Sequence, residues 1–584
     1  MTPDRTHATS PRKPLRLWPG VITVALQWLT LLALPILAPD ARIAGILAPF
    51  AAGLVVVVWW VFFSRALWSE RVGAIVLMIV AVAVTSRVLH PSIATSGQGM
   101  LFFFKTVPVL SLAFVVWAVA SRHLADSPRR LTMAATLLFA CGGWALLRSD
   151  GLTGEGALEL RWRWAKTAEQ RLLARMDVDP TPDPAASPEL SEAIEAEWPG
   201  FRGPGRNGVV PGVAIATDWS KSRPVELWRR KVGPGISSFA VHGDLLYTQE
   251  QRGDHESVAC YHATTGELVW RHLDETRFWD SHVGAGPHST PTLSGGRVYT
   301  FGATGILNAL DAADGAVVWS RNVASELDRK VPYWGFSSSP LVVDDAIIVS
   351  AAAQLVAYDA DTGDRRWSGP VGGFGHSSPH LLTIDGVAQV LLLSAAGATS
   401  VAPGDGTLLW QYPWRGTMYV QPGWIAGGNL LLSAADEAGG VGMRRITVAR
   451  GAARGAGGWT AEERWTSARL KPYFSDFVVH NGHAYGFDGR ILAAIDIENG
   501  ERQWKGGRYG HGQLVLLPDQ NMLLVLSEKG ELALVGATPD AFTEHARLAV
   551  LSGKTWNHPV LVGDLLLVRN REEMAAFRLP LARG

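Results

Sequence analysis

The sequence has few cysteines and no excess charge of either sign, and both facts exclude classes of protein. Two cysteines in 584 residues rule out a disulfide scaffold and a four-cysteine metal cluster. No Cys-x-x-Cys-His motif occurs, so we expect no haem. The 53 Lys and Arg residues balance 53 Asp and Glu residues, which argues against a nucleic-acid partner. Charged residues make up 18% of the chain, below the roughly 25% of soluble proteins, and this indicates a membrane portion.

The first 150 residues contain apolar stretches of about the length that crosses a bilayer core. We predict a five-helix transmembrane domain over 17–147, with spans at Leu17–Leu37, Ile43–Phe63, Val72–Val88, Met100–Ala120 and Leu131–Leu147. A cleaved signal peptide is disfavoured for the first stretch because four more follow at once. Basic residues gather at the N-terminal tail (1–16) and the alternate loops, so the positive-inside rule places that tail in the cytoplasm. The sequence thus predicts a multi-pass protein of the bacterial inner membrane, embedded in the lipid bilayer, with its C-terminal part in the periplasm.

Three polar residues lie near the predicted outer interface of the membrane. Arg87, His90 and Lys105 are either side chains that snorkel to the interface or a site for the head group of a membrane quinone. Residues 148–197 then form a periplasmic linker. Leu158–Met176 alternates apolar and basic residues at helical spacing, which predicts an amphipathic helix at the interface. Asp177–Ser191 is rich in Pro, Asp and Ala, which favours an extended spacer.

The last part of the chain, 198–584, contains one element repeated at intervals of about 40–50 residues. A glycine precedes a tryptophan by four residues in copies that end at Trp270, Trp319, Trp367, Trp410 and Trp504. This pattern is typical of a tight turn, where glycine supplies a positive φ, and an outer strand that ends in a large ring. Trp465 ends a degenerate copy whose turn carries the insertion Arg450–Gly458.

The starts of the repeats predict an eight-bladed β-propeller, an all-β domain that follows the helical membrane domain. Starts of apolar inner strands occur near residues 237, 289, 338, 377, 422, 475, 513 and 557. The last repeat ends at Leu579 without an outer strand, while Val225–Trp228 is a strand without a blade. If Val225–Trp228 forms the outer strand of the last blade, the ring closes and every predicted strand belongs to a blade.

These repeats resemble the tryptophan-docking repeat of the pyrroloquinoline-quinone (PQQ) propeller superfamily. The fullest copy is Ala357-Tyr-Asp359-Ala-Asp-Thr362-Gly363-Asp-Arg-Arg-Trp367, and the resemblance covers 225–580. Trp198-Pro-Gly-Phe-Arg-Gly-Pro-Gly-Arg-Asn-Gly208 is also similar to the lead-in segment of PQQ-like propellers. Five spans before such a propeller resemble the layout of membrane-bound quinoprotein glucose dehydrogenase. The resemblance implies that the docking tryptophans are structural.

The superfamily includes both dehydrogenases and cofactor-free propellers, such as the lipoprotein scaffold of outer-membrane β-barrel assembly. The adjacent-cysteine disulfide of the alcohol dehydrogenase branch cannot form here, because Cys141 and Cys260 lie far apart in the chain. No Glu/Asn/Asp set aligns with a calcium site, so the metal ligands stay unknown.

The linkers between predicted blades contain aromatic and cationic residues, among them Lys330, Tyr333 and His376. All such linkers open on one face of a propeller. A flat tricarboxylate such as PQQ needs rings to stack on and cations for its carboxylates. For PQQ, with Ca²⁺, we predict binding by Trp334, Trp414, Arg415, Lys471, Arg508 and Trp556. Asp476 is the predicted catalytic base because it begins an inner strand. The alternative is that the rings pack the linkers and the charges are solvated.

The sequence therefore leaves two functions open. One is a quinoprotein-like dehydrogenase that oxidises an alcohol or a sugar and passes electrons to membrane quinone. The other is a cofactor-free propeller that serves as a membrane-tethered binding or assembly scaffold. Neither the substrate nor a protein partner follows from the sequence.

Overall fold

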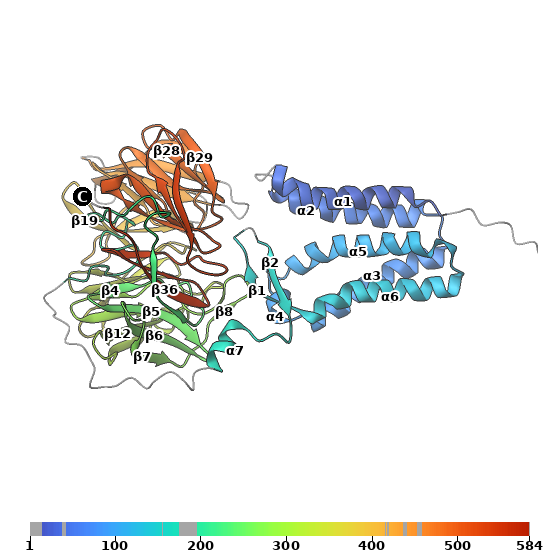
Figure 1. The fold of residues 1–584 in the computed structure, drawn as a ribbon, viewed down its shortest axis with the longest axis horizontal. Helices are drawn as coiled ribbons and strands as arrows, with labels where there is room; N and C mark the ends of the chain where they lie inside the picture. Colours follow the sequence, from blue (N-terminus) through green and yellow to red (C-terminus); the bar gives the residue numbers. More distant parts are fainter. Residues whose placement is uncertain are drawn as a thin grey trace, which may run out of the picture. The chain divides into compact units, whose positions relative to one another are not determined.

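The computed structural model describes residues 15–37, 42–154, 156–174, 195–414, 416, 420–435, 441–451 and 458–582. The predicted spacer Asp177–Ser191 and most of the tail 1–16 lie outside these residues. The chain divides into two compact units, Met1–Ala165 with Ser281–Val283, and Lys166–Asp280 with Gly284–Gly584. Figure 1 draws the first unit as helices with a small hairpin and the second as β-sheets.

The first unit has a helix at or near each predicted span. The long helices are α1 (Trp18–Leu37), α2 (Arg42–Val58) with the π-helical turn η1 (Trp59–Phe63), α3 (Trp68–Val88), α5 (Leu101–Ala120) and α6 (Asp126–Gly142). A short helix, α4 (Pro91–Ala94), follows α3, and the 3₁₀ turn η2 (Ser121–His123) follows α5. Among the residues that the structure describes, two helices rather than five are long and apolar enough to cross a membrane, Trp68–Val88 and Leu101–His123. The helical unit is confirmed, and the count of five spans is not.

The last predicted span is shifted, and the amphipathic helix predicted over Leu158–Met176 is wrong in its first half. Helix α6 begins at Asp126 because Ser127-Pro128 favours a helix start, and it ends at Gly142 before the 3₁₀ turn η3 (Gly143–Leu146). Strands β1 (Leu147–Leu152) and β2 (Leu158–Trp162) then form an antiparallel hairpin. The sequence of β2 alternates apolar and charged residues with period two, which suits a strand, and only α7 (Ala168–Leu173) is helical, behind a Thr167 capping box.

The second unit is the predicted eight-bladed propeller, with four strands in each blade. Blades 1 to 4 are formed by β4 (Ala240–His242), β5 (Leu245–Arg252), β6 (His255–His262), β7 (Leu268–Asp274); β10 (Thr292–Ser294), β11 (Arg297–Phe301), β12 (Ile306–Asp311), β13 (Val317–Asn322); β14 (Leu341–Val343), β15 (Ala346–Ala351), β16 (Gln354–Asp359), β17 (Arg365–Val371); and β18 (His380–Ile384), β19 (Val387–Ser394), β20 (Gly397–Val401), β21 (Leu408–Tyr412).

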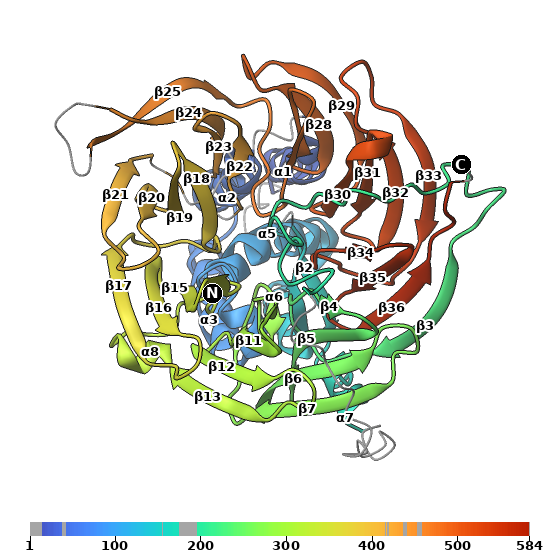
Figure 2. The same ribbon diagram turned by 90° about the vertical axis from the view of Figure 1, so that its left-hand side faces the viewer.

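Blades 5 to 8 continue around the ring (Figure 2). They are formed by β22 (Gly423–Ile425), β23 (Asn429–Ala434), β24 (Gly442–Arg450), β25 (Trp459–Ser467); β26 (Val478–His480), β27 (His483–Asp488), β28 (Ile491–Asp496), β29 (Arg502–Arg508); β30 (Gln513–Leu517), β31 (Met522–Leu526), β32 (Glu531–Gly536), β33 (Glu544–Ala549); and β34 (Val560–Val562), β35 (Leu565–Arg569), β36 (Glu573–Arg578), β3 (Val225–Lys231). Between blades lie the short pair β8 (Trp279–Asp280) and β9 (Gly284–Ala285) and helix α8 (Val323–Glu326), while the turn η7 (Pro518–Gln520) joins β30 to β31 within blade 7.

The repeated tryptophans dock each blade on the next one. The Trp319 Nε1 donates to the Ala360 carbonyl at 2.9 Å, and a Cβ atom on Gly363 would come within 2.6 Å of the Trp319 ring. Gly363 has a φ of 69°, which glycine adopts without strain. The rings of Trp228, Trp270, Trp367 and Trp465 lie in the same way over Gly266, Gly315, Gly406 and Gly500. These tryptophans therefore have a structural role, as predicted.

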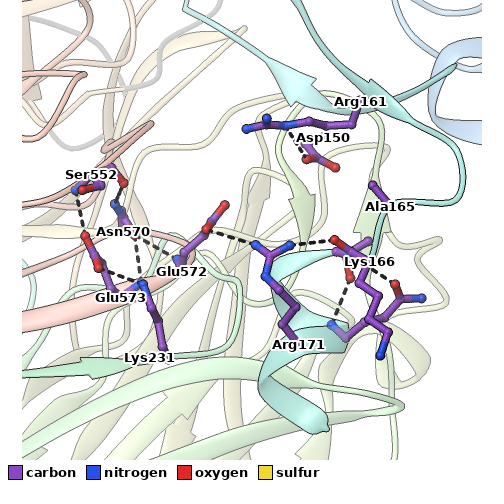
Figure 3. A network of polar contacts seen from close by, with 12 residues as sticks. Asp150, Arg161, Ala165, Lys166, Arg171, Lys231, Ser552, Asn570, Glu572 and Glu573 are labelled. Carbon is purple, nitrogen blue, oxygen red and sulfur yellow. Dashed lines mark hydrogen bonds and ion pairs between the residues drawn. The ribbon is translucent and has the colours of Figure 1, made fainter. Parts of the chain in front are cut away.

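The ring closes as predicted, through a strand from the start of the propeller. Strand β3 pairs antiparallel with β36, with Trp228 opposite Ala576 (Figure 2, green against dark red). Figure 3 shows the polar contacts at this junction. Lys231 Nζ lies 3.0 Å from the Glu573 carboxylate, which also accepts from the Ser552 backbone N–H at 2.7 Å. Arg171 of α7 lies 3.8 Å from Glu572. Closure thus joins distant parts of the sequence by hydrogen bonds and ion pairs.

Candidate functional site

The lead-in segment occupies the middle of the ring of blades. We call Trp198–Val210 the plug. Its backbone bonds to inner strands: the Val241 N–H donates to the Trp198 carbonyl at 2.8 Å, the Leu293 N–H to the Pro199 carbonyl at 2.7 Å, and the Val210 N–H to the Leu516 carbonyl at 2.8 Å. These contacts tie the plug to blades 1, 2 and 7.

The plug enters and leaves the ring from one end. This end carries the turns that join the inner strand of each blade to the second strand of the same blade, and we call it the turn face. The opposite end carries the linkers between blades, and we call it the linker face. The Gly243 N–H in the first such turn donates to Glu197 Oε2 at 2.9 Å, before the plug. The Gly212 N–H, just after the plug, donates to Asp519 Oδ2 at 2.6 Å, in the turn η7 of blade 7.

Two buried arginines fix the plug at its deepest point. Arg206 donates to the Pro340 carbonyl at 2.8 Å and to the Ser339 carbonyl at 3.1 Å, at the start of blade 3. Arg202 donates to the Phe477 carbonyl at 2.7 Å, at the start of blade 6. Both arginines have positive φ values, 62° and 50°, which non-glycine residues adopt only where the surroundings hold them. The chain itself therefore occupies part of the channel of this propeller.

Asp476, the predicted catalytic base, is a partner of the plug. Its Oδ2 lies 3.4 Å from Arg202 Nε, and its Oδ1 accepts from the Gln421 backbone N–H at 3.2 Å. The residue is 3% exposed; burial raises the pKa of its carboxyl, and the Arg202 charge opposes that shift. Because both carboxylate oxygens already have partners, the geometry gives Asp476 an anchoring role.

The predicted cations do not converge on one point. Lys471 Nζ lies 3.9 Å from Asp488, which also pairs with Arg502 at 2.6 Å and with Lys505 at 2.7 Å. Arg508 is exposed at the end of β29. Arg415 lies outside the described residues. The carboxylate of Asp488 thus attracts the Lys471 ammonium, which we predicted to bind a carboxylate of the cofactor.

The three predicted tryptophans have different neighbours. Trp414 is 8% exposed and lies inside the core shared by blades 4 and 5, with the Arg444 guanidinium 4.4 Å from its ring centre. Trp334 packs against Phe374, with ring centres 5.5 Å apart.

Trp556 lies 5.0 Å from the ring of Phe474, and its Nε1 donates to Glu528 Oε1 at 3.1 Å. The rings pack linkers together, as the alternative interpretation proposed.

As placed, the predicted residues do not fit PQQ with Ca²⁺. The carboxylate of Asp476 is paired with Arg202, and the ammonium of Lys471 is attracted to Asp488. In the part of the chain that the structure describes, no group of three or more His, Cys, Asp and Glu side chains could hold a metal ion. Cys141 and Cys260 are both buried, in different units. We therefore derive no reaction step through a quinone at this site.

In the first unit, His90 has a structural contact. Its Nδ1 lies 2.9 Å from Ser92 Oγ and accepts from the Ser92 backbone N–H at the start of α4. The quinone head-group site at Arg87, His90 and Lys105 stays a prediction.

A surface on the linker face was missed as a unit by the sequence reasoning. We call it the blade 3–4 patch: Arg329, Lys330, Val331, Tyr333, Val371 and Phe374. Its four apolar residues are exposed, and the patch borders a cavity of about 310 Å³ whose lining includes both cations. The sequence singled out Lys330 and Tyr333, but Val371 ends an outer strand and gave no signal of its own. Exposed apolar residues beside cations form a surface suited to a protein partner.

Part of the repeat region is similar to known proteins. Residues 254–424 match the family model described as outer membrane protein assembly factor BamB, which confirms PQQ-like repeats there. The chain is 24% identical over 293 residues to BamB of Yersinia pestis, across 48% of this chain and 61% of that protein. It is 30% identical over 131 residues to BamB of Escherichia coli, across 21% of this chain and 33% of that protein. The chain thus spans less than two thirds of these relatives.

Two solved structures resemble part of the chain, both with TM-scores under 0.5. BamB from Moraxella catarrhalis has a TM-score of 0.44 and 14% identity, over 62% of this chain and all of that one. A quinohemoprotein alcohol dehydrogenase from Pseudomonas putida has a TM-score of 0.47 and 13% identity, over 67% of this chain and 81% of that one. Similarities this distant do not separate a scaffold from a dehydrogenase.

Proposed function

We propose that this protein is a membrane-tethered propeller that works, without a cofactor, as a docking scaffold for another protein in the periplasm. The observation that carries the proposal is the plug, since a chain segment and its Arg202–Asp476 pair occupy the place where we predicted the cofactor and its base. The match of residues 254–424 to an assembly factor supports a role in the assembly of outer membrane proteins.

The blade 3–4 patch is the proposed docking surface. Apolar side chains at Val331, Tyr333 and Phe374 would lose water on contact, which is the main driving force of association. Arg329 and Lys330 at the rim favour a partner with surface carboxylates beside its own apolar residues. Among the described residues, no feature supports the alternative function, a dehydrogenase that oxidises an alcohol or a sugar, as the patch supports docking.

The tether is the first unit, which we propose crosses the inner membrane five times with its N-terminus in the cytoplasm. An α-helix rises about 1.5 Å per residue, so the 21 residues of α3 would span about 30 Å, the thickness of a bilayer core. The excess of basic residues in alternate loops supports this orientation.

Photo-crosslinking in cells tests the docking proposal. With a photoreactive amino acid in place of Tyr333, we expect one discrete adduct, which should disappear when Arg329→Glu and Lys330→Glu are added because the rim charge is reversed. The matched control carries the photoreactive residue at Val318, which is also exposed but lies on the outer strand of blade 2, and it should give no such adduct. Equal adducts at both positions, or an adduct that survives charge reversal, would contradict this use of the patch.

A further inference from the structure

A cavity opens on the turn face, at the part of the channel that the plug leaves unfilled. Its volume is about 350 Å³, within the range of pockets that hold small molecules. The plug forms one side through Arg202, Gly205, Asn207 and Val209. The inner strands of blades 4, 5 and 6 form the other sides. The described backbone bonds of the plug go to blades 1, 2 and 7, so the gap lies on the opposite part of the ring.

Part of the wall of this turn-face cavity is apolar. Trp424 is 39% exposed and Leu381 is 40% exposed, although both lie on inner strands, where side chains are usually covered. Val479 adds a third apolar side chain. An indole and two aliphatic side chains that face water in a concave site favour a ligand with an apolar part.

Buried positive charge exceeds negative charge beside the cavity, because Arg202 lines it and Arg206, outside the lining, is near enough for its charge to act on His380. Arg202 and Arg206 are both buried, and the carboxylate of Asp476 pairs with Arg202. Among the described residues, no carboxylate lies within ion-pair distance of Arg206, whose bonds go to neutral carbonyls. Burial and the Arg202 charge lower the pKa of Arg206 to about 10, so it stays charged at neutral pH. One buried positive charge is therefore uncompensated, which is costly unless an anion approaches.

Two neutral polar groups line the cavity above this charge. His380 is 5% exposed, and its Nδ1 is buried with no hydrogen-bond partner. Burial and the charges of Arg206 and Arg202 lower the pKa of His380 to about 3, so its ring is neutral at pH 7 and can donate one N–H bond. The Asn207 Oδ1 accepts from the Val209 N–H at 3.1 Å, which leaves the amide of Asn207 as a second donor.

We propose that the turn-face cavity binds a small organic monocarboxylate with an apolar ring or chain. The carboxylate would lie near His380 and Asn207, in the field of Arg202 and Arg206, and the apolar part against Trp424 and Leu381. This site is distinct from the docking surface on the linker face.

Calorimetric titration of the full chain in detergent tests the proposal, with 3-phenylpropionate and the neutral 3-phenylpropionamide as probes. The acid should bind saturably, and the amide about tenfold or more weakly, because it lacks the charge that the arginines attract. Trp424→Ala should weaken both probes about fivefold or more, since the indole forms the apolar wall.

Asn207→Asp is the sharpest variant, because it adds a negative charge and keeps the oxygen that accepts the backbone N–H. It should abolish binding of the acid and spare the amide. The matched control is Asn499→Asp in an exposed turn, where the side-chain oxygen also accepts an N–H two residues on, at 2.8 Å, and it should bind both probes normally. Equal binding of acid and amide, no saturable binding of the acid, or an equal loss in both Asn variants would overturn the proposal.

Discussion

Single residues decide how neighbouring blades meet. Because the tryptophan and its glycine recur with fixed spacing, their role could be predicted from the sequence and is confirmed by rings that lie over Gly266, Gly315, Gly363, Gly406 and Gly500. Trp410 departs from this pattern, and its Nε1 donates to Gln389 Oε1 at 2.6 Å. Both residues belong to blade 4, so this ring bonds within its own blade.

The pairing of Asp476 with Arg202 could not be predicted. A carboxylate at the start of an inner strand points toward the channel whether or not a plug occupies it. No pattern in the sequence connects Arg202 in the plug with Asp476, which lies much later in the chain. The same reason explains why Lys471 looked available, since its neighbour Asp488 lies at the end of another strand.

Gly363→Ala tests the docking of blades at the residue scale. The new Cβ would contact the Trp319 ring, and alanine at a φ of 69° is strained, so we expect the free energy of unfolding to fall by about 2–4 kcal/mol. Gly404→Ala is the control, because a Cβ there meets nothing within 4 Å, and it should change stability by about 0.5 kcal/mol or less. Urea unfolding followed by tryptophan fluorescence measures both. Equal effects would mean that the glycine is not needed for docking.

At the scale of elements, a buried charge network joins the closing strand to blades 1 and 8. The Glu250 carboxylate accepts from Arg252 Nε at 2.6 Å and from the backbone N–H of Gly233, just after β3. Arg569 at the end of β35 donates to the Gln249 carbonyl at 2.9 Å. The sequence predicted the closing strand because Val225–Trp228 belonged to no other blade. It gave no sign of this network, whose members come from the first and last parts of the propeller sequence.

Glu250→Gln tests that network through its pH dependence. Burial raises the pKa of Glu250, but the charges of Arg252, Arg271 and Arg569 outweigh this effect and lower it below the usual range. A lowered folded-state pKa gives stability that is present above the unfolded pKa of about 4.5 and is lost as pH falls through the folded pKa. We therefore expect the variant to be about 3–5 kcal/mol less stable at pH 7, with the difference shrinking toward pH 3.

Denaturant unfolding at several pH values provides the measurement. Glu462→Gln is the control, because that carboxylate is 65% exposed beside Arg464 and its loss should cost about 0.5 kcal/mol or less at every pH. A difference for Glu250→Gln that stays constant with pH would mean that its charge does not stabilise closure.

At the scale of the whole molecule, the chain combines a helical unit with a propeller whose channel is partly occupied by the plug. The eight blades followed from repeat counting, and the helices followed from long apolar stretches. The strand β2 was missed because its five residues, which alternate apolar and charged with period two, fall at the start of a longer segment predicted to be helical. Function was the least predictable property, because whether a channel is open depends on a segment that lies before the repeats.

The central claim is that the plug, and not a quinone, occupies the place predicted for the cofactor. Calorimetric titration of the folded full chain with PQQ and Ca²⁺ tests it most directly. We predict no saturable heat, and the same result for Asp476→Asn, which keeps the shape of the side chain. Saturable binding of PQQ to the wild-type protein, together with oxidation of an alcohol or sugar that Asp476→Asn abolishes, would contradict the scaffold and restore the dehydrogenase.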